Sequence, residues 1–192
     1  MRATSRRMHY TYAEYLGLEE ESSIRHEYLD GEIYAMAGGT PDHAALAAAV
    51  LAIIRAQLPR GYRAFTSDLR IRIPATGLST YPDGAVVCGG TQRAAEDALA
   101  VTNPILLLEV TSNSSEDYDR GEKLRQYQAI ATAREIVIVS HRERRIVLYS
   151  RDASGWQLTE ARAGASVPLE SIGGTLSVDD VYREGLEDVP HG

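Results

Sequence analysis

Two acidic residues and the only lysine of this chain have the types and the spacing that could hydrolyse a phosphodiester bond. Asp83 follows Pro82 just before an apolar run, and Glu109 lies near the carboxyl end of the apolar segment 105–110. Lys123 comes fourteen residues later, in a chain whose other nineteen basic residues are arginines. Two carboxylates on neighbouring strands could bind a divalent metal, and a lysine could place a compact positive charge beside the attacking water. This order of residues therefore predicts metal-dependent hydrolysis.

The two carboxylates favour Mg²⁺ or Mn²⁺ as the metal, because hard oxygen ligands suit these ions and water completes their octahedron. Glu109 is the harder one to explain structurally, since a lone carboxylate in a buried strand is costly and needs a partner or a cation. Simpler explanations remain for each residue. Pro82-Asp83 is a common turn pair, Glu109 could form a salt bridge, and Lys123 could be solvated and pair with Asp119.

Further side chains are candidates for roles around the predicted metal. His43 falls in the first turn of a predicted helix and could hold a phosphate or a metal-bound water, or simply cap the sheet edge. Asp68 could support the site or cap a turn. Arg120 and Tyr127 lie three residues before and four residues after Lys123, on one face of a predicted helix. We predict that His43 is catalytic and that Asp68, Tyr127 and Arg120 are supporting residues.

Two arginines are candidates for nucleic-acid binding. Arg70 and Arg72 alternate with Leu69, Ile71 and Ile73, which predicts a strand with one apolar and one basic face. The basic face is predicted to contact a phosphate backbone. The alternative is an ordinary solvated face.

Periodicity and turn signals predict the elements that must position these side chains. An almost wholly apolar helix follows Thr40 and Pro41, which suit the N-cap and the first helical position, and such a helix is usually buried against a sheet. Segment 105–110 is apolar on both faces, which is typical of a central strand. The predicted order is helix 12–21, hairpin 25–37, helix 43–58, strand 62–73, loop 75–80, strand 84–88, irregular segment 89–103, strand 105–110, helix 114–130, strands 134–141, 144–151 and 156–161, and helix 179–187.

The predicted hairpin carries two more acidic residues. Asp30-Gly31 is a strong signal for its tight turn, and Glu27 and Glu32 lie on either side of that turn. Both glutamates are interpreted as surface residues, although either of them could reach the site.

Bulk composition limits the class of protein. A chain of 192 residues with 44% hydrophobic and 24% charged residues is typical of a globular protein, and we expect one domain over residues 1–192. The single cysteine, Cys88, excludes an intramolecular disulfide and suits a reducing cytoplasm. Neither a secretory signal nor a membrane-spanning run is predicted. The net charge of −7 argues against tight non-specific DNA binding, but it does not exclude a nuclease, because metal ions neutralise their acidic ligands.

Several of these motifs together resemble the Uma2 family, also called DUF820, a group described as restriction endonucleases. The resemblance spans most of the chain, from Tyr10 to about Tyr182. Any one matching stretch alone would be weak, but the set is quite specific. The stretches are residues 10–16, 25–34, 39–43, 66–71, 81–83, 108–112 and 119–123, with Tyr127.

The resemblance implies a branch of the PD-(D/E)XK nuclease superfamily with an α/β (α+β) fold. That restriction-endonuclease-like fold has a mixed, four-stranded central sheet flanked by helices, here with an N-terminal hairpin and a C-terminal β extension. Asp83 would be the motif aspartate and Glu109 the second acid. The motif lysine usually follows two residues after the second acid, where this chain has Thr111. The resemblance therefore suggests that Lys123 has taken over its role.

We therefore predict a metal-dependent endonuclease that acts on DNA and pairs as a cytoplasmic homodimer, so that two active sites address both strands. The alternative is a module that keeps the nuclease fold and binds nucleic acid or protein without cleavage. The acidic balance and the absence of a lysine at position 111 favour that alternative.

Overall fold

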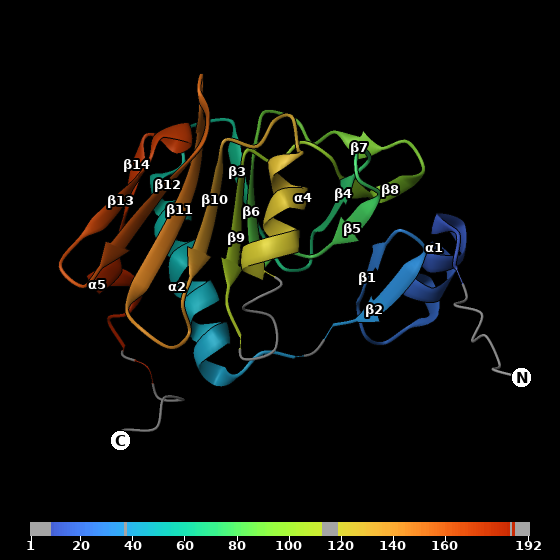
Figure 1. The fold of residues 1–192 in the computed structure, drawn as a ribbon, viewed down its shortest axis with the longest axis horizontal. Helices are drawn as coiled ribbons and strands as arrows, with labels where there is room; N and C mark the ends of the chain where they lie inside the picture. The colour runs from blue at the N-terminus through green and yellow to red at the C-terminus, as the bar shows by residue number, and fades with distance from the viewer. Residues whose placement is uncertain (1–8, 37, 113–118, 185, 187–192) are drawn as a thin grey trace, which may run out of the picture.

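The computed structural model describes residues 9–36, 38–112, 119–184 and 186, without the side chains of residues 119 and 120. Within that part of the chain, two six-stranded mixed sheets and a few helices form a mixed α/β structure (Figure 1). The central sheet has the order β12-β11-β10-β9-β6-β3, and the N-terminal sheet has the order β2-β1-β5-β4-β8-β7. The predicted mixture of helices and strands is confirmed at this level.

The central sheet is built around β9, which runs parallel to β10 and antiparallel to β6. Every residue of β9 is buried, as its two apolar faces predict. β11 and β12 extend the sheet beyond β10 as an antiparallel hairpin, so the sheet has six strands and not four. The strands are β3 (Tyr62–Thr66), β6 (Gly84–Cys88), β9 (Leu106–Val110), β10 (Glu135–Val139), β11 (Arg145–Asp152) and β12 (Gly155–Arg162).

Two helices cover opposite faces of this sheet (Figure 1). Successive side chains of a strand point to opposite faces. Leu108 of β9 therefore packs in one core with Leu46 of α2 (Pro41–Gln57), and Leu107 packs in the other core with Tyr127 of α4 (Leu124–Gln128). Because Glu109 follows Leu108, its side chain faces α4.

Helix α2 begins where the sequence predicts, with Thr40 as its N-cap. It packs against the sheet as expected, and it does so through one side. Leu46, Val50 and Ile54 face the sheet. The opposite side of the helix is exposed and consists largely of alanines. The exposed alanines are Ala44, Ala45, Ala48, Ala52 and Ala56. Among the described helices, none has both the length and the apolar character that would let it cross a membrane.

The N-terminal helix and hairpin agree with prediction. Helix α1 (Tyr12–Glu21) starts with a capping box, in which Thr11 accepts from the Glu14 N–H and the Glu14 carboxylate accepts from the Thr11 N–H. Strands β1 (His26–Leu29) and β2 (Glu32–Ala35) pair antiparallel. Asp30 and Gly31 have φ values of 48° and 83°, as a two-residue turn of this hand requires.

The predicted strand 62–73 is two strands in different sheets. The chain turns at residues 67–69, so β3 joins the central sheet and β4 (Arg70–Ile73) joins the N-terminal sheet. The predicted loop at 75–80 contains β5 (Leu78–Thr80). The segment expected to be irregular contains β7 (Arg93–Ala94) and β8 (Asp97–Val101). Sequence periodicity missed these strands because they are short.

The predicted helix 114–130 is shorter in the described residues. It consists of a π-helical turn, η1 (Asp119–Lys123), followed by α4, and residues 114–118 lie outside the described part of the chain. The closing helix is α5 (Val178–Val181), while positions 185 and 187 of the predicted helix are not described. Between β12 and α5 the chain forms a two-stranded sheet. Its strands, β13 (Ser166–Leu169) and β14 (Gly174–Ser177), are joined by η2 (Glu170–Ile172).

Candidate functional site

Asp83 lies immediately before the first residue of β6, across from β9. Gly84 pairs with Leu108, so the residue before it comes level with Glu109. The Asp83 Oδ2 accepts a hydrogen bond from the Val110 N–H at 2.7 Å, which fixes the carboxylate against the neighbouring strand. Gly84 has a packing role here, because a Cβ at that position would come within 3.1 Å of Leu51 Cδ1 on α2.

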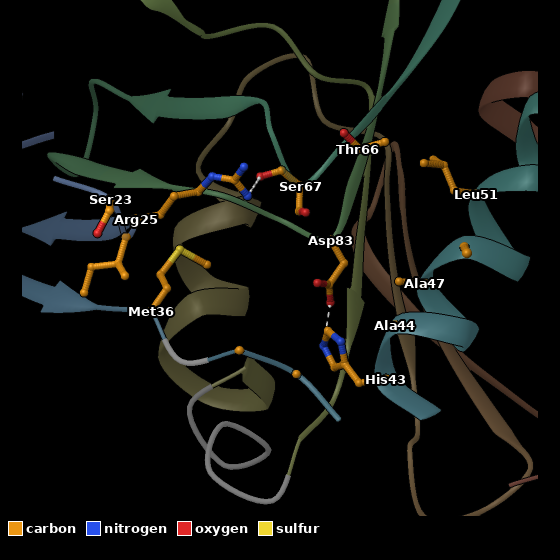
Figure 2. A pocket seen from close by; sticks show the side chains of 14 residues that line it. Ser23, Arg25, Met36, His43, Ala44, Ala47, Leu51, Thr66, Ser67 and Asp83 are labelled. Atoms are coloured by element: carbon orange, nitrogen blue, oxygen red, sulfur yellow. Dashed lines mark hydrogen bonds and ion pairs between the residues drawn. The ribbon is translucent and has the colours of Figure 1, made fainter. Parts of the chain in front are cut away.

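His43 faces Asp83 from the first turn of α2 (Figure 2). Its Nε2 is 3.3 Å from Asp83 Oδ2, and both side chains are largely buried. This hydrogen bond raises the pKa of the His43 imidazole above its ordinary value, against the opposing effect of burial. The charges of Asp83 and Glu109 raise it further. Gly39 leaves room for the ring, since a Cβ there would lie 2.5 Å from His43 Nδ1.

Glu109 is 5% exposed and contacts Lys123 and Tyr127 on the helical segment that covers its face of the sheet. Its Oε1 is 3.0 Å from the Lys123 Nζ and accepts a hydrogen bond from the Tyr127 hydroxyl. Burial raises the pKa of the Tyr127 hydroxyl well above its ordinary value, and the Glu109 charge adds to this. Tyr127 therefore remains a hydrogen-bond donor that orients the Glu109 carboxylate.

Lys123 is buried between two carboxylates. The side chain is 7% exposed, and its Nζ is 3.0 Å from Glu109 Oε1 and 3.1 Å from Glu27 Oε1. Glu27 comes from β1 of the N-terminal hairpin and also accepts a hydrogen bond from Thr80 on β5. The ammonium group therefore joins the two sheets near the carboxyl end of β9. The simpler explanation of a solvated lysine is wrong.

Thr111 lies two residues after Glu109, where the resemblance described above would place a lysine, and it is fully buried. Its hydroxyl lies 2.8 Å from His141 Nδ1, and its N–H donates to the Val139 carbonyl at 2.9 Å. The residue continues the pairing of β9 with β10. A long charged side chain here would have to enter this packed region, whereas Lys123 reaches Glu109 from the helix.

The carboxylates have the donor chemistry that a divalent metal requires. Both contacts of Asp83 use Oδ2, which leaves Oδ1 for a metal among the described residues. In that part of the chain, no three histidine, cysteine, aspartate or glutamate side chains form a ready-made metal cage. Mg²⁺ does not need one, because it commonly takes one or two carboxylates and keeps several waters. Asp83 and Glu109 supply oxygen ligands of this kind.

Comparisons with known proteins agree with this arrangement of elements. The family model named Uma2, described as "Putative restriction endonuclease", matches residues 12–179. The chain belongs to the Uma2 family. Two uncharacterized Synechocystis proteins are similar to it: slr1290 is 36% identical over 172 residues (88% of this chain, 90% of that protein), and sll1609 is 31% identical over 152 residues (78% and 86%).

A solved structure shows the same fold as this Uma2 chain. It is described as a putative nuclease belonging to DUF820 from Anabaena variabilis, and it superposes with a TM-score of 0.68 at 20% identity. The match covers 85% of this chain and 92% of the other. The resemblance to Uma2 that the sequence motifs carry is thereby confirmed.

Arg70 and Arg72 are not the exposed basic face that their alternation predicts. They are 6% and 9% exposed and lie inside the N-terminal sheet. Arg70 Nε is 3.0 Å from Asp97 Oδ2, and Arg72 Nε is 3.0 Å from Glu96 Oε1. The Arg72 guanidinium also lies over the Tyr12 ring, 3.9 Å from its centre. Carboxylates and a tyrosine that are distant in the sequence allow these arginines to be buried, so they are structural in this fold.

Two other predicted site residues have no described contact with Asp83, Glu109 or Lys123. The Asp68 side chain is 78% exposed and pairs with Arg25 at the turn between β3 and β4. It therefore stabilises that turn. The side chain of Arg120 lies outside the described part of the chain.

Glu27 belongs to the site, although the sequence predicts a surface residue. It forms one side of the Lys123 pair, whereas Glu32, across the same turn, bonds to the Tyr34 hydroxyl. The Asp30-Gly31 turn sets the register of the hairpin and thereby the face on which Glu27 lies. No local pattern shows which part of the molecule that face meets, so only the tertiary structure reveals the contact.

Proposed function

We propose that this Uma2 protein is a metal-dependent endonuclease that hydrolyses phosphodiester bonds of DNA. One observation carries the proposal: Lys123, the only lysine, is buried with its ammonium against Glu109, and Asp83 is held on the adjacent strand. We further propose that β3, β6, β9 and β10, with α2 and α4 on either side, are the core of a PD-(D/E)XK nuclease. The DUF820 structure supports this assignment through the shared fold.

In the proposed mechanism, Asp83 and Glu109 would hold Mg²⁺ or Mn²⁺. The bound metal would polarise the phosphate and lower the pKa of an attacking water. The chain's own residues fix the geometry. The Val110 N–H and His43 orient the Asp83 carboxylate, and Tyr127 orients Glu109. Lys123 supplies positive charge next to Glu109, where negative charge on the phosphate oxygens increases during the reaction.

Cleavage of DNA in the presence of Mn²⁺ tests the proposal. We expect Asp83→Asn and Glu109→Gln each to lower the rate by about 100-fold or more, because each removes a charged metal ligand while keeping its shape. Asp68→Asn is the matched control, since this exposed aspartate lies at the turn and should leave the rate within about twofold. Equal rates in all four proteins would refute the enzymatic function.

The second candidate is a module that binds nucleic acid or protein without turnover. One observation favours it: Lys123 already pairs with two carboxylates, which is what a purely structural ion cluster would also show. A calorimetric titration with Mn²⁺ separates the two. The nuclease requires metal binding that Asp83→Asn weakens by about 10- to 100-fold, whereas a structural cluster has no need of the ion.

Three further parts of the proposal concern assembly and context. DNA is the proposed partner, and a homodimer would let two sites address both strands. Sedimentation of the purified protein, alone and with a DNA duplex, tests both. A cytoplasmic location is proposed because the single cysteine suits a reducing compartment, and fractionation of the source cells tests it.

A further inference from the structure

A pocket opens directly beside the Asp83–His43 pair, between the N-terminal segment and helix α2 (Figure 2). Its volume is about 640 Å³, within the range of about 300–1,000 Å³ that small-molecule sites occupy. Asp83 and His43 form part of its wall, so whatever enters it lies next to the proposed metal ligands.

The lining of this pocket is mainly uncharged. Ala44, Ala48 and Leu51 of α2 form one side, and Ile24 and Met36 contribute from the N-terminal segment. The alanine side chains are short, which leaves a shallow apolar surface without a protruding group. Such a surface suits the flat, apolar face of a ring.

The one arginine at the pocket is already engaged. Arg25 Nη1 donates to the Ser67 carbonyl at 2.9 Å, and its Nη2 bonds to Asp68. No other cation besides His43 lines the pocket in the described residues. A phosphate inside it would therefore lack a counter-charge, whereas a phosphate at the Asp83 end would meet the proposed metal. An occupant with a neutral ring attached to a phosphate matches this distribution of charge.

We infer that this pocket binds an unpaired nucleobase of the DNA strand, next to the phosphate that is cleaved. The inference rests on the proposed function and adds a substrate class to it: strands with an unpaired nucleotide at the cleavage point, such as single strands, flaps and frayed ends. A base inside a duplex is stacked and paired, so it must leave the helix before it can enter a pocket of this kind.

The polar groups at the pocket predict little preference for one base over another. Besides the charged side chains and the Thr66 hydroxyl, which bonds to Asp68, they are the hydroxyls of Ser23 and Ser67, which can each donate or accept a hydrogen bond. Hydroxyls of this kind can rotate to suit different base edges. The pocket therefore selects unpaired over paired nucleotides and not a particular sequence.

Binding of a fluorescent single strand tests the inference without cleavage. The probe is an oligonucleotide with a terminal 2-aminopurine, measured with the Glu109→Gln protein. Ala48→Leu, which fills the pocket from an exposed position on α2, should weaken binding about tenfold. Ala45→Leu is the matched control, because Ala45 is exposed on the same helix, lines a different pocket and should change binding less than about twofold.

The comparison oligonucleotide has an abasic site in place of the terminal base, and its binding is measured by competition with the 2-aminopurine strand. It should bind about tenfold more weakly than the 2-aminopurine strand, and Ala48→Leu should remove that difference. Equal binding of the two oligonucleotides, equal effects of the two leucine variants, or no binding of single strands at all would each overturn the inference.

A cleavage assay separates this inference from the proposed function. The wild-type protein should cleave a duplex with a mismatched pair at the cleavage point about tenfold faster than a fully paired one. Cleavage of both duplexes at the same rate would refute base binding by the pocket, while the proposed nuclease activity would still hold. Base-dependent binding with no cleavage of any substrate would refute the proposed nuclease activity, while the inference that the pocket binds an unpaired base would still hold.

Discussion

At the scale of single residues, the site depends on how a buried ammonium group is compensated. Removing one partner of a buried ion pair is costly, since the remaining charge loses its counter-charge without regaining water. Lys123 has carboxylates from two different sheets at 3.0 and 3.1 Å. Glu109 belongs to the metal site that we propose, so Glu27 can hold the lysine in place when Glu109 binds a metal.

Glu27→Gln tests this positioning role. We expect the cleavage rate at saturating DNA to fall about tenfold with little change in KM, because Lys123 loses the contact that holds its ammonium in place. Glu32→Gln, across the same hairpin turn, is the control and should stay within about twofold. Glu27→Asp should recover part of the rate. A purely structural role would lower the melting temperature and leave the rate of the folded protein unchanged.

The Asp83–His43 contact makes a prediction about titration. In metal-free buffer, the pKa of His43 should lie above its ordinary value of about 6.5 and should fall in Asp83→Asn, because the hydrogen bond to Asp83 is the main cause of the shift. A pKa that is raised on folding stabilises the protein below the unfolded pKa, and this stabilisation is lost as the pH rises through the folded pKa. An NMR titration of the His43 ring checks the shift, and an unchanged pKa in the variant would contradict the contact.

At the scale of elements, strand β4 shows why alternation of charge did not identify a surface. Its arginines are buried because β8 and the segment before it supply Asp97 and Glu96 as partners. Arg70 also lies near the Tyr15 and Tyr81 rings, at 5.7 and 5.8 Å from their centres. The strand therefore contributes to the stability of the N-terminal sheet.

Arg70→Ala should lower the free energy of unfolding by about 3 kcal/mol or more, because the buried Asp97 carboxylate keeps its hydrogen bonds but loses the positive charge beside it. The double variant Arg70→Met, Asp97→Leu should recover part of that loss, since it removes both charges. Denaturant unfolding measures the effect. A normal free energy of unfolding combined with weaker, less salt-dependent DNA binding would restore the original hypothesis of a phosphate-contacting arginine.

At the scale of the whole molecule, the two sheets share one of the two cores and meet at the proposed site. Ile71 and Leu78 of the N-terminal sheet pack in the same cluster as Leu107 and Tyr127 of the central region. The Lys123 contacts bridge the same junction. The pocket beside Asp83 lies along it as well, with residues of both the N-terminal segment and α2 in its lining. Movement of one sheet relative to the other would therefore alter the pocket and the lysine together.

The sequence by itself determined the elements whose signals are local. Capping at Thr11 and Thr40, the Asp30-Gly31 turn and the apolar run of β9 all act within a few residues, so α1, α2, the first hairpin and the central strand could be predicted. The Uma2 membership and the identity of Asp83, Glu109 and Lys123 as candidates also came from motifs in the chain.

The tertiary structure alone decided which charged side chains meet. Glu27 reaches Lys123 over nearly a hundred positions of sequence, and Arg70 and Arg72 find acids on another strand. The break at residues 67–69, which sends β3 and β4 into different sheets, has the same origin. A charged side chain can be buried only when packing brings a partner close to it. The residues adjacent to it in the sequence do not predict where that partner comes from.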